Sequence, residues 1–404
     1  MALIVQKYGG SSLAGPDRIQ SVADHVARTR RQGREVAVVV SAMGKTTDDL
    51  VHLAAQVSRS RPGREMDMLL TAGERISMAL LVMALADLGV NGASFTGSQA
   101  GIITDTTHGR AKILEVKGDR LRQALVDGQV PVVAGFQGVS TTYDVTTLGR
   151  GGSDTTAVAL AAALGAEACE LYTDVPGVFT ADPRIVASAR RISRLSFEEM
   201  LEMAAVGCPK PDMRSVEFAR NHKVPLHVRS SFTWEPGTWI TEEDPSMEQP
   251  IVSGVVDDDS EAKVTITGVP DRPGIAAQLF RALADHHVNV DMIVQNVSDH
   301  GVTDISFTVP KDDLTVALDV ARPVSAAIGA AEVLADAAIA RVSLIGAGMK
   351  THPGIAATMF ETLAGEGVNI EMISTSPIRI SCVVRDDQLE RAVQALHAAF
   401  DLER

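Results

Sequence analysis

The hydrophobic pattern of the first 230 residues alternates short β-branched runs with longer amphipathic segments. The runs are typical of buried strands; they are ALIVQKY at 2–8, EVAVVVSA at 35–42, QVPVVAGF at 129–136 and CELYTDV at 169–175. Residues 16–32 predict a helix, because Pro16 and Asp17 suit a helical first turn. This alternation predicts an α/β sandwich around a mostly parallel sheet.

The pattern changes at 233–250, TWEPGTWITEEDPSMEQP, which is rich in proline and acidic residues. We place the main domain boundary there, so that the first domain is predicted to span residues 1–245 and the second region residues 246–404. A length of 404 residues fits at least two domains.

The second region contains an internal repeat. PGIAA occurs at 273–277 and 353–357, and VN follows each copy at 288–289 and 368–369. Each copy predicts a strand, a turn, a helix, a turn and a strand, which gives two small units at about 263–335 and 340–404 with a shared buried face. A strand within 250–262 is predicted to complete the second unit. Free N–H groups at each helix start suit a carboxylate ligand, although a duplicated scaffold is also compatible with a purely structural role.

Composition excludes several classes of function. Lys and Arg number 37 against 51 Asp and Glu, a net charge of −14, which argues against binding nucleic acid or anionic membranes through general charge. The start MALIVQKYGG lacks the features of a signal peptide, and apolar stretches such as 78–90 are interrupted too soon to span a bilayer, so we expect a cytoplasmic protein. Cys169, Cys208 and Cys382 have no CxxC spacing, which favours free thiols over a metal site.

Two predicted strands end in loops that could bind phosphate. After the first strand, a lysine and a Gly-Gly pair at 7–12 offer a mobile charge and an anion nest, although a plain strand–helix turn explains the glycines equally well. The second strand leads to GKT at 44–46. This is not a P-loop, because Val39 stands where that pattern requires glycine.

The strongest motif is LGRGGSDTTA at 148–157, which leads into an alanine-rich helix. Arg150 can fork onto a carboxylate, Ser153 can cap the helix and leave N–H groups facing an anion, and Asp154 can orient a lysine or a metal-bound group. An elaborate capped turn is the alternative interpretation. A further polar loop at 172–184, YTDVPGVFTADPR, offers the aromatic, acidic and basic groups that a nucleotide would use.

Glu74 lies in an otherwise apolar helical pattern, TAGERIS at 71–77. Together with Arg150 it would complement the two ends of a zwitterion. No Ser-His-Asp or Cys-His pairing is evident. A carboxylate acceptor, with a pKa of about 4, needs no such base, so the pattern favours phosphoryl transfer from ATP to a small anionic metabolite.

Together, KYGGSS at 7–12, TAGERIS, GFQG at 135–138, the glycine-rich motif and YTDVPGVFTADPR resemble the aspartokinases. The PGIAA repeats resemble the ACT regulatory domains of that family, so the resemblance covers essentially the whole chain. It implies a three-layer α/β amino-acid-kinase sandwich with a mostly parallel sheet, followed by two ferredoxin-like ACT (βαββαβ) domains. It also implies the reaction of L-aspartate and MgATP to 4-phospho-L-aspartate and ADP, the entry step toward lysine, threonine, methionine and isoleucine.

The resemblance assigns site residues motif by motif. Lys7 and Asp154 look like the catalytic pair, with Lys7 cancelling charge on the transferring phosphoryl group. The residues that resemble the aspartate site are Thr47, Glu74, Phe136, Arg150 and Ser153. Those that resemble the nucleotide site are Lys7, Gly9, Gly10, Ser11, Thr173, Asp174, Phe179, Asp182, Arg184 and Lys210. No tightly bound cofactor and no separate metal site are implied, because Mg²⁺ would arrive with ATP.

In the ACT region, six residues resemble positions that hold an amino-acid effector, for which lysine and threonine are the usual inhibitors in such enzymes. These residues are Asp271, Gly274, Ala276, Gln295, Asn369 and Ile370. The resemblance further implies a homo-oligomer joined through the ACT domains, and a shorter subunit that would start at Met247.

Two departures from the family pattern bear on function. After FEEMLEMAA the family usually reads Gly-Ala-Lys-Val-Leu, whereas Pro209 fills the lysine position here and Lys210 is displaced by one. Either Lys210 substitutes for that lysine or the affinity for ATP falls. Many relatives carry an acid in STSEIRIS where this chain has Pro377, and the loss of that acid predicts relaxed or altered feedback by lysine.

Two other functions fit part of the pattern. The first is another amino-acid kinase that acts on glutamate or acetylglutamate, and the paired repeats and RGGSDTTA argue against this function. An amino-acid-sensing regulator with an impaired kinase domain is the other, and Pro209 leaves it open.

Overall fold

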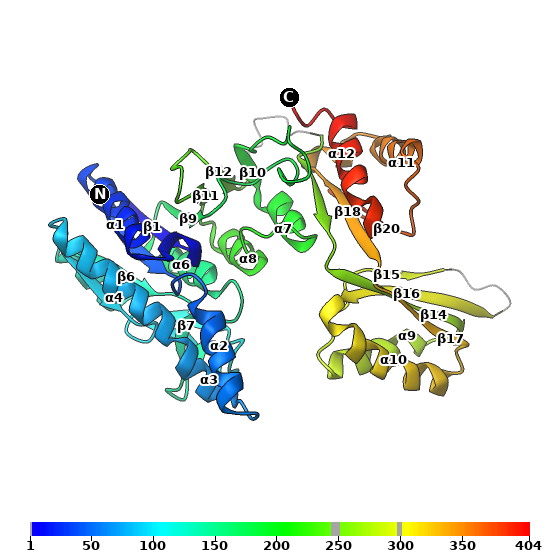
Figure 1. Ribbon diagram of the computed structural model, residues 1–404, viewed down its shortest axis with the longest axis horizontal. Helices are drawn as coiled ribbons and strands as arrows, with labels where there is room; N and C mark the ends of the chain where they lie inside the picture. The colour runs from blue at the N-terminus through cyan, green and yellow to red at the C-terminus, as the bar shows by residue number, and fades with distance from the viewer. Residues whose placement is uncertain (1, 244–250, 297–300) are drawn as a thin grey trace. The chain divides into compact units, whose positions relative to one another are not determined.

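The chain forms two compact units in the computed structural model, which describes residues 2–243, 251–296 and 301–404 (Figure 1). The first unit comprises Met1–Val178, Arg191–Ala205 and Pro209–Met247, and the second comprises Phe179–Arg190, Val206–Cys208 and Glu248–Arg404. Two short segments that precede the predicted boundary therefore belong to the second unit. Met247, the candidate internal start, lies outside the described residues.

The first unit is built on an eight-stranded sheet with the order β10-β12-β11-β9-β1-β2-β6-β3. Its strands are β1 (Leu3–Tyr8), β2 (Glu35–Val40), β3 (Gly92–Phe95), β6 (Val130–Ala134), β9 (Ala168–Thr173), β10 (Arg194–Ser196), β11 (Leu226–Ser230) and β12 (Thr238–Thr241). All neighbours pair in parallel except β11 with β12. The four predicted buried runs form β1, β2, β6 and β9, which lie next to one another in this sheet.

Helices cover both faces of the sheet (Figure 1). The helices of the first unit are α1 (Pro16–Arg31), α2 (Thr46–Val57), α3 (Gly63–Leu70), α4 (Ala72–Asp87), α5 (Asp119–Val126), α6 (Gly152–Leu164), α7 (Phe197–Ala205) and α8 (Met213–His222). Of these, α2 and α3 pack on each other, and α3 contacts the strand Val145–Thr147 outside the large sheet. Helices α1 and α4 pack together over one face, around the valines of β2 and the side chain of Tyr8. Helix α6 contacts β1, β2 and β9, and its alanines let it lie close to the sheet. The predicted three-layer sandwich is thus confirmed.

A second, smaller sheet in the first unit has the order β5-β4-β7-β8. Its strands are β4 (Ile102–Thr104), β5 (Ile113–Val116), β7 (Gln137–Ser140) and β8 (Val145–Thr147). It carries the GFQG turn at the start of β7 and leads from β8 into the glycine-rich loop before α6.

One stretch, Gly63–Asp87, is apolar and long enough by composition and length to cross a membrane. It consists of α3 and α4, which are part of the first unit. Asp67 and Glu74 are both buried within it. Buried acids that contact other parts of the unit favour helices of a folded core over a membrane span.

The second unit contains two four-stranded antiparallel sheets with helices on them. The first repeat consists of β14 (Glu261–Pro270), α9 (Ile275–Asp285), β15 (Ile293–Gln295), β16 (Val302–Pro310), α10 (Leu314–Ile328) and β17 (Glu332–Asp336). The second consists of β18 (Ile339–Ile345), α11 (Ile355–Gly365), β19 (Met372–Ser376), β20 (Arg379–Arg385) and α12 (Leu389–Ala399). Strand β13 (Gly254–Asp258) pairs with β18 and so supplies the second sheet with its fourth strand. Both sheets have the strand order expected of a ferredoxin-like fold, which confirms this part of the predicted fold class.

A buried arginine connects the two repeats. Arg341 of β18 is 2% exposed and pairs with Asp258 at 2.8 Å and with Glu261 at 3.4 Å. It also pairs with Asp291 of the first repeat. Burial raises the pKa of Glu261 to about 7, and the positive charge of Arg341 opposes that rise. One cation therefore compensates carboxylates from both repeats.

We expect the substitution R341M to destabilise the second unit by about 3 kcal/mol, because removing one partner of a buried ion pair leaves its carboxylates without compensation. The free energy of unfolding, measured with urea, checks this. The matched control is R322M, since Arg322 is exposed on α10. Equal stabilities of the two variants would contradict the structural role given to Arg341.

Candidate active site

Lys7 and Asp154 meet on one face of the large sheet. Alternate residues of a strand face opposite sides of a sheet, and Tyr8 faces the α1 side, so Lys7 faces α6. The Nζ atom of Lys7 forms an ion pair with Oδ1 of Asp154, in the first turn of α6. The two side chains are 8% and 4% exposed. The sequence prediction that these residues come together agrees with this geometry, and the pair lies at the carboxyl end of β1, where α/β sheets bind ligands.

The loops that follow β1 and β2 are hydrogen-bonded to each other and packed closely beside this pair. The N–H of Gly44 donates to the carbonyl oxygen of Gly10 at 3.0 Å. A Cβ on Gly10 would lie 3.0 Å from the carbonyl oxygens of Ala42 and Gly44, so a larger residue would separate the loops. A Cβ on Gly9 would lie 3.5 Å from Nζ of Lys7. The glycine loop therefore passes next to the lysine amine, as phosphate binding would require.

Glu74 is a buried acid with one unused oxygen. It is 3% exposed in the first turn of α4, and its Oε1 accepts a hydrogen bond from the N–H of Ala42 at 3.1 Å. Its Oε2 is buried and has no hydrogen-bond partner among the described residues. Burial raises the pKa of Glu74 to about 7. A ligand cation against Oε2 would favour the ionised form, so this position suits an ammonium group.

Close packing joins Glu74 to the loop that carries Thr47. A Cβ on Gly73 would lie 2.7 Å from Cβ of Ala42 and 3.6 Å from Cγ2 of Thr46, at the start of α2. Helix α4 and the 42–47 loop can approach this closely only because residue 73 is glycine. The start of α2, which carries Thr47, therefore lies beside the start of α4, which carries Glu74.

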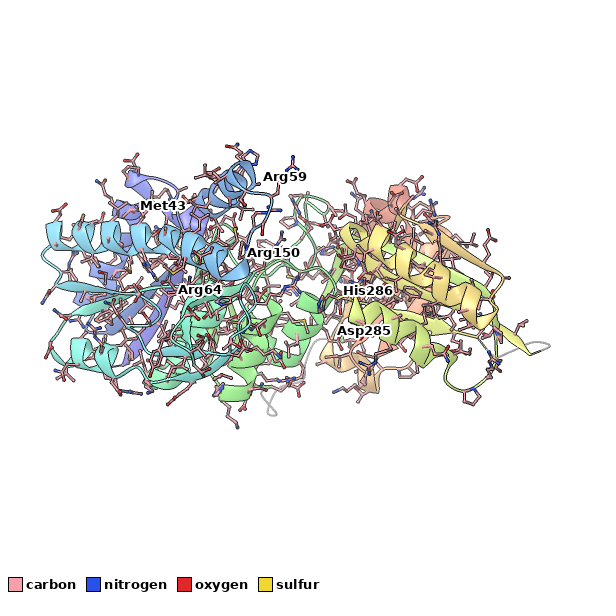
Figure 2. The ribbon with its side chains drawn as sticks, turned by 90° about the horizontal axis from the view of Figure 1, so that it is seen from below. Met43, Arg59, Arg64, Arg150, Asp285 and His286 are labelled. Atoms are coloured by element: carbon pink, nitrogen blue, oxygen red, sulfur yellow. The ribbon has the colours of Figure 1, made fainter. Side chains whose placement is uncertain are left out.

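The glycine-rich loop and the GFQG turn pack on each other. Phe136 has a φ of 67°, which is uncommon outside glycine. A Cβ on Gly152 would lie 3.0 Å from Cδ2 of Phe136, and a Cβ on Gly135 would lie 2.9 Å from Oγ of Ser153. The structure therefore brings Phe136 and Ser153 together. Arg150, two residues before α6, is exposed, and Figure 2 shows its place on the first unit.

The residues assigned to the nucleotide divide between the two units. In the first unit, Thr173 ends β9, and its hydroxyl donates to Oδ1 of Asp174 at 2.9 Å. The N–H of Ser231 donates to the carbonyl oxygen of Thr173, and the Ser231 hydroxyl donates to that of Ser12 at 2.7 Å. Ser12 and its neighbour Ser11 lie in a 3-10 helix at Gly10–Leu13. The carboxyl ends of β1, β9 and β11 thus meet at one edge of the sheet.

Phe179, Asp182 and Arg184 belong to the second unit. Arg184 is highly exposed and pairs with Asp182 at 2.5 Å, and this hydrogen-bonded guanidinium lowers the pKa of Asp182. The segment is held within its unit by a hydrogen bond of 2.9 Å between the Thr180 hydroxyl and Nε2 of His397. Lys210 belongs to the first unit and precedes a cis peptide bond to Pro211.

The predicted effector residues lie in different parts of the two repeats. Gly274 has a φ of 96° and precedes α9, with Asp271 before it and Ala276 in the first turn of the helix. Gln295 ends β15. In the second repeat, Asn369 and Ile370 lie between α11 and β19. Met292, just before β15, and Met372, the first residue of β19, share one small apolar cluster, so the segments that carry Gln295 and Ile370 lie close together.

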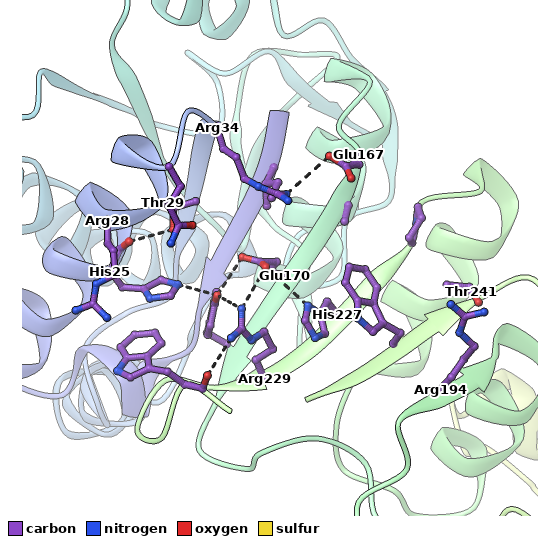
Figure 3. Close-up of a pocket in the computed structure, with 17 residues that line it drawn as sticks. His25, Arg28, Thr29, Arg34, Glu167, Glu170, Arg194, His227, Arg229 and Thr241 are labelled. Carbon is purple, nitrogen blue, oxygen red and sulfur yellow. Dashed lines mark hydrogen bonds and ion pairs between the residues drawn. The ribbon is translucent and has the colours of Figure 1, made fainter. Parts of the chain in front are cut away.

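A cavity of about 710 Å³ lies on the opposite face of the large sheet from Lys7 (Figure 3). Its floor is a hydrogen-bonded network in which Glu170 accepts from Nε2 of Gln6 at 2.8 Å and from the Tyr172 hydroxyl at 3.0 Å. Although burial opposes it, hydrogen bonds from His227 and Gln6 hold the pKa of Glu170 at about 2. Because alternate residues of β1 face opposite sides, this cavity is separate from the Lys7–Asp154 pair.

Sequence reasoning missed two charged side chains beside the glycine-rich loop. Asp67 of α3 is fully buried, and Arg214 lies in the first turn of α8; both form hydrogen bonds to the segment that precedes Arg150. A signal for Asp67 was present, because it is a lone acid in the apolar run MDMLL, just as Glu74 is in TAGERIS. Arg214 had no such signal, since charged residues are common in exposed helical turns.

Comparisons with known proteins agree with this arrangement. Residues 2–230 match the model of the amino acid kinase family, and residues 264–322 and 342–400 match an ACT domain model. The chain is 59% identical over 407 residues to the aspartokinase of Mycobacterium tuberculosis, a match that covers 100% of this chain and 97% of the relative.

Two solved structures of E. coli aspartokinase III show the same fold at 26% identity, each covering 98% of this chain and 99% of that chain. The R-state complex with aspartate and ADP has a TM-score of 0.83, and the T-state complex with lysine and aspartate has a TM-score of 0.77. Because the sequence match extends over both units, the chain belongs to the aspartokinases, within the amino acid kinase family.

Proposed function

We propose that the edge of the sheet around Lys7, Asp154 and Glu74 is the reaction centre at which this aspartokinase transfers the terminal phosphoryl group of ATP to the side-chain carboxylate of L-aspartate. The observation that carries the assignment is the buried ion pair of Lys7 and Asp154 beside the glycine loop. The products are 4-phospho-L-aspartate and ADP.

The chemistry needs charge compensation more than proton transfer. A carboxylate oxygen of aspartate attacks the terminal phosphorus of ATP, the new O–P bond forms, and the bond to the ADP oxygen breaks. The ammonium group of Lys7 offsets the negative charge of both reactants as they approach, and Asp154 orients that ammonium. The N–H of Gly9 already donates to the carbonyl oxygen of Tyr172 at 3.1 Å, so what the glycine loop contributes is the close approach of its backbone to Lys7.

The two ends of aspartate are held by groups of opposite charge. Glu74 receives the α-ammonium group through its unused Oε2, and Arg150 receives the α-carboxylate. Thr47, Phe136 and Ser153 complete this pocket. With both ends fixed, only the side-chain carboxylate of the substrate remains to face ATP, which explains how the site selects the acceptor oxygen.

ATP is expected to bind with Mg²⁺ as a substrate complex, along the loops that contain Gly9, Gly10, Ser11, Thr173 and Asp174. Lys210, which also belongs to the first unit, completes the set proposed there. Among residues 2–243, 251–296 and 301–404, no group of three or more His, Cys, Asp or Glu side chains is arranged to hold a metal ion. We expect the enzyme to act in the cytoplasm, at the start of lysine, threonine, methionine and isoleucine synthesis.

Regulation is assigned to the two ACT repeats. We propose that lysine, threonine or both bind at Asp271, Gly274, Ala276, Gln295, Asn369 and Ile370, and that the enzyme is a homo-oligomer joined through this region. A shorter subunit started at Met247 remains part of the proposal. Pro377 lies exposed in the turn between β19 and β20, and the absence of an acid there is expected to relax control by lysine.

We expect K7M to lower kcat by about 10²- to 10³-fold, because one preorganised positive charge at the transferring phosphoryl group is lost. Trapping of the acyl phosphate with hydroxylamine measures the product, with aspartate, glutamate and acetylglutamate as acceptors. K112M, at an exposed lysine between β4 and β5, is the control. Product formed with glutamate and none with aspartate would overturn the assigned acceptor, and full activity of K7M would overturn the role of the lysine.

We expect the KM for aspartate to rise as the pH falls below about 7, because protonated Glu74 cannot pair with an ammonium group. E74Q should raise this KM by about 10- to 100-fold at pH 8, since a hydrogen bond to a charged group is lost, and should remove the pH dependence. The variant E65Q, at an exposed glutamate of α3, should behave like the wild type. A pH-dependent KM that persists in E74Q would show that another group binds the ammonium.

We expect the substitution P377E to strengthen inhibition by lysine by about tenfold, a typical coupling between two sites, because it restores an acid at the ACT hairpin. Inhibition curves with lysine, threonine and both measure the effect, and the threonine curve of the same variant is the internal control. Strong concerted inhibition of the unmodified enzyme at sub-millimolar effector would contradict relaxed control.

A further inference from the structure

We propose that Asp67 and Arg214 hold the glycine-rich loop at the distance from Glu74 that aspartate requires, so that these two side chains determine the affinity for aspartate. The proposal rests on the assignment of Glu74 and Arg150 to the two ends of the substrate. In the described parts of the chain, neither Asp67 nor Arg214 is hydrogen-bonded to Lys7 or Asp154, and both act as positioning residues.

Asp67 connects α3 to two other segments of the first unit, Thr147 and residues 108–109. Its Oδ1 accepts a hydrogen bond of 2.5 Å from the Thr147 hydroxyl, at the end of β8. Both carboxylate oxygens accept from the N–H of Gly109, at 3.1 and 3.2 Å, and Oδ2 lies 2.7 Å from Nδ1 of His108. The side chain is fully buried. Thr147 is itself buried, so removing the carboxylate would leave its hydroxyl without this buried hydrogen bond.

Arg214 holds the same two loops from α8. Its Nη1 donates to the carbonyl oxygen of Leu148 at 2.8 Å, and its Nη2 donates to that of Ala111 at 2.9 Å. A backbone hydrogen bond of 2.9 Å from Ala111 to Thr147 runs between these contacts. The loop that leads to Arg150 is therefore fixed on the segment 108–111 by a carboxylate and a guanidinium from different helices.

Glycines allow the loops to approach this closely. Gly149 has a φ of 80°, and a Cβ there would lie 3.1 Å from the carbonyl oxygen of Gly109. A Cβ on Gly151 would overlap the carboxylate of Asp212, which caps α8 next to Arg214. Arg150 thus stands between two residues whose backbone has little freedom to move.

Asp67 connects this loop to the other end of the substrate site. It lies seven residues before Glu74, and α3 and α4 are separated only by Thr71, which ends one helix and precedes the other. Gln137 also donates to the carbonyl oxygen of Thr71, at 3.3 Å. One short helical segment therefore carries both the group that binds the ammonium and the group that anchors the loop of Arg150. The spacing of Glu74 and Arg150 follows from this connection, and the length of aspartate must match it.

The test compares D67N with the matched variant D105N. The Asp105 carboxylate holds the same 105–112 loop by accepting from the N–H groups of Thr107 and Lys112, whereas the Thr147 hydroxyl donates to Asp67. We expect D67N to raise the KM for aspartate by about tenfold or more, since small displacements of positioning groups are costly, while the KM for ATP stays unchanged. D105N should change neither value.

A double-mutant cycle separates positioning from general structural damage. If Asp67 acts through Arg150, D67N should have little further effect on the KM for aspartate in an R150A background. Additive effects, or equal rises in the KM values for aspartate and ATP, would overturn the proposal. If R150A and E74Q leave the KM for aspartate unchanged, the substrate assignment itself fails, which is a different result from a normal KM in D67N alone.

Two milder variants cover the case in which D67N does not fold. T147V removes one hydrogen bond to Asp67 and keeps the carboxylate. R214M removes the guanidinium that donates to the carbonyl oxygens of Leu148 and Ala111. Both should raise the KM for aspartate selectively, with thermal unfolding midpoints close to that of the wild type. A wild-type KM for aspartate in both variants would overturn the proposal.

Discussion

The buried ion pair of Lys7 and Asp154 is the interaction on which the proposed reaction centre depends. Removing two charges from water is costly unless they compensate each other. The register of β1 places Lys7 toward α6, and the small residues of that helix let its first turn reach the strand end. The ammonium group is therefore held in place before any substrate arrives. Preorganised charge of this kind stabilises a transition state without reorganisation during the reaction.

At Glu74, by contrast, no positively charged side chain of the described residues compensates the buried carboxylate. Its Oε2 is desolvated and has no hydrogen-bond partner in the described chain, and the raised pKa of the group records the cost of that burial. Such a group destabilises the empty site and is stabilised when a ligand cation arrives. Local strain and unsatisfied groups are tolerated where function needs them and the surrounding packing is strong. The close contact of Gly73 with Ala42 and the anchoring of α3 through Asp67 provide that packing.

Much of this organisation was predictable from the sequence, because it is encoded locally. The four β-branched runs form the central strands, α1 begins at Pro16, and the repeated PGIAA turns each precede a helix. The contacts between loops were not predictable in the same way. Thr147 and Asp67 are 80 residues apart, and no periodic pattern relates them. The segment Phe179–Arg190 belongs to the second unit through contacts such as Thr180 with His397, which are 217 residues apart. Such pairings depend on three-dimensional packing and produce no local pattern in the amino-acid sequence.

An acidic protein that must bind two anions needs its positive charge in specific places. With a net charge of −14, the chain would repel ATP and aspartate if charge acted at long range, but salt screens charges beyond about 10 Å. Only groups close to the reactants then matter. In the proposed site Lys7 and Arg150 supply the cations, and the glycine loops let the backbone come close without adding net charge. Asp154 pairs with Lys7 and so allows the ammonium group to be buried, and in the proposed reaction the same group faces the phosphoryl group. The geometry of the loops, and not the overall charge, therefore decides which anions the site accepts.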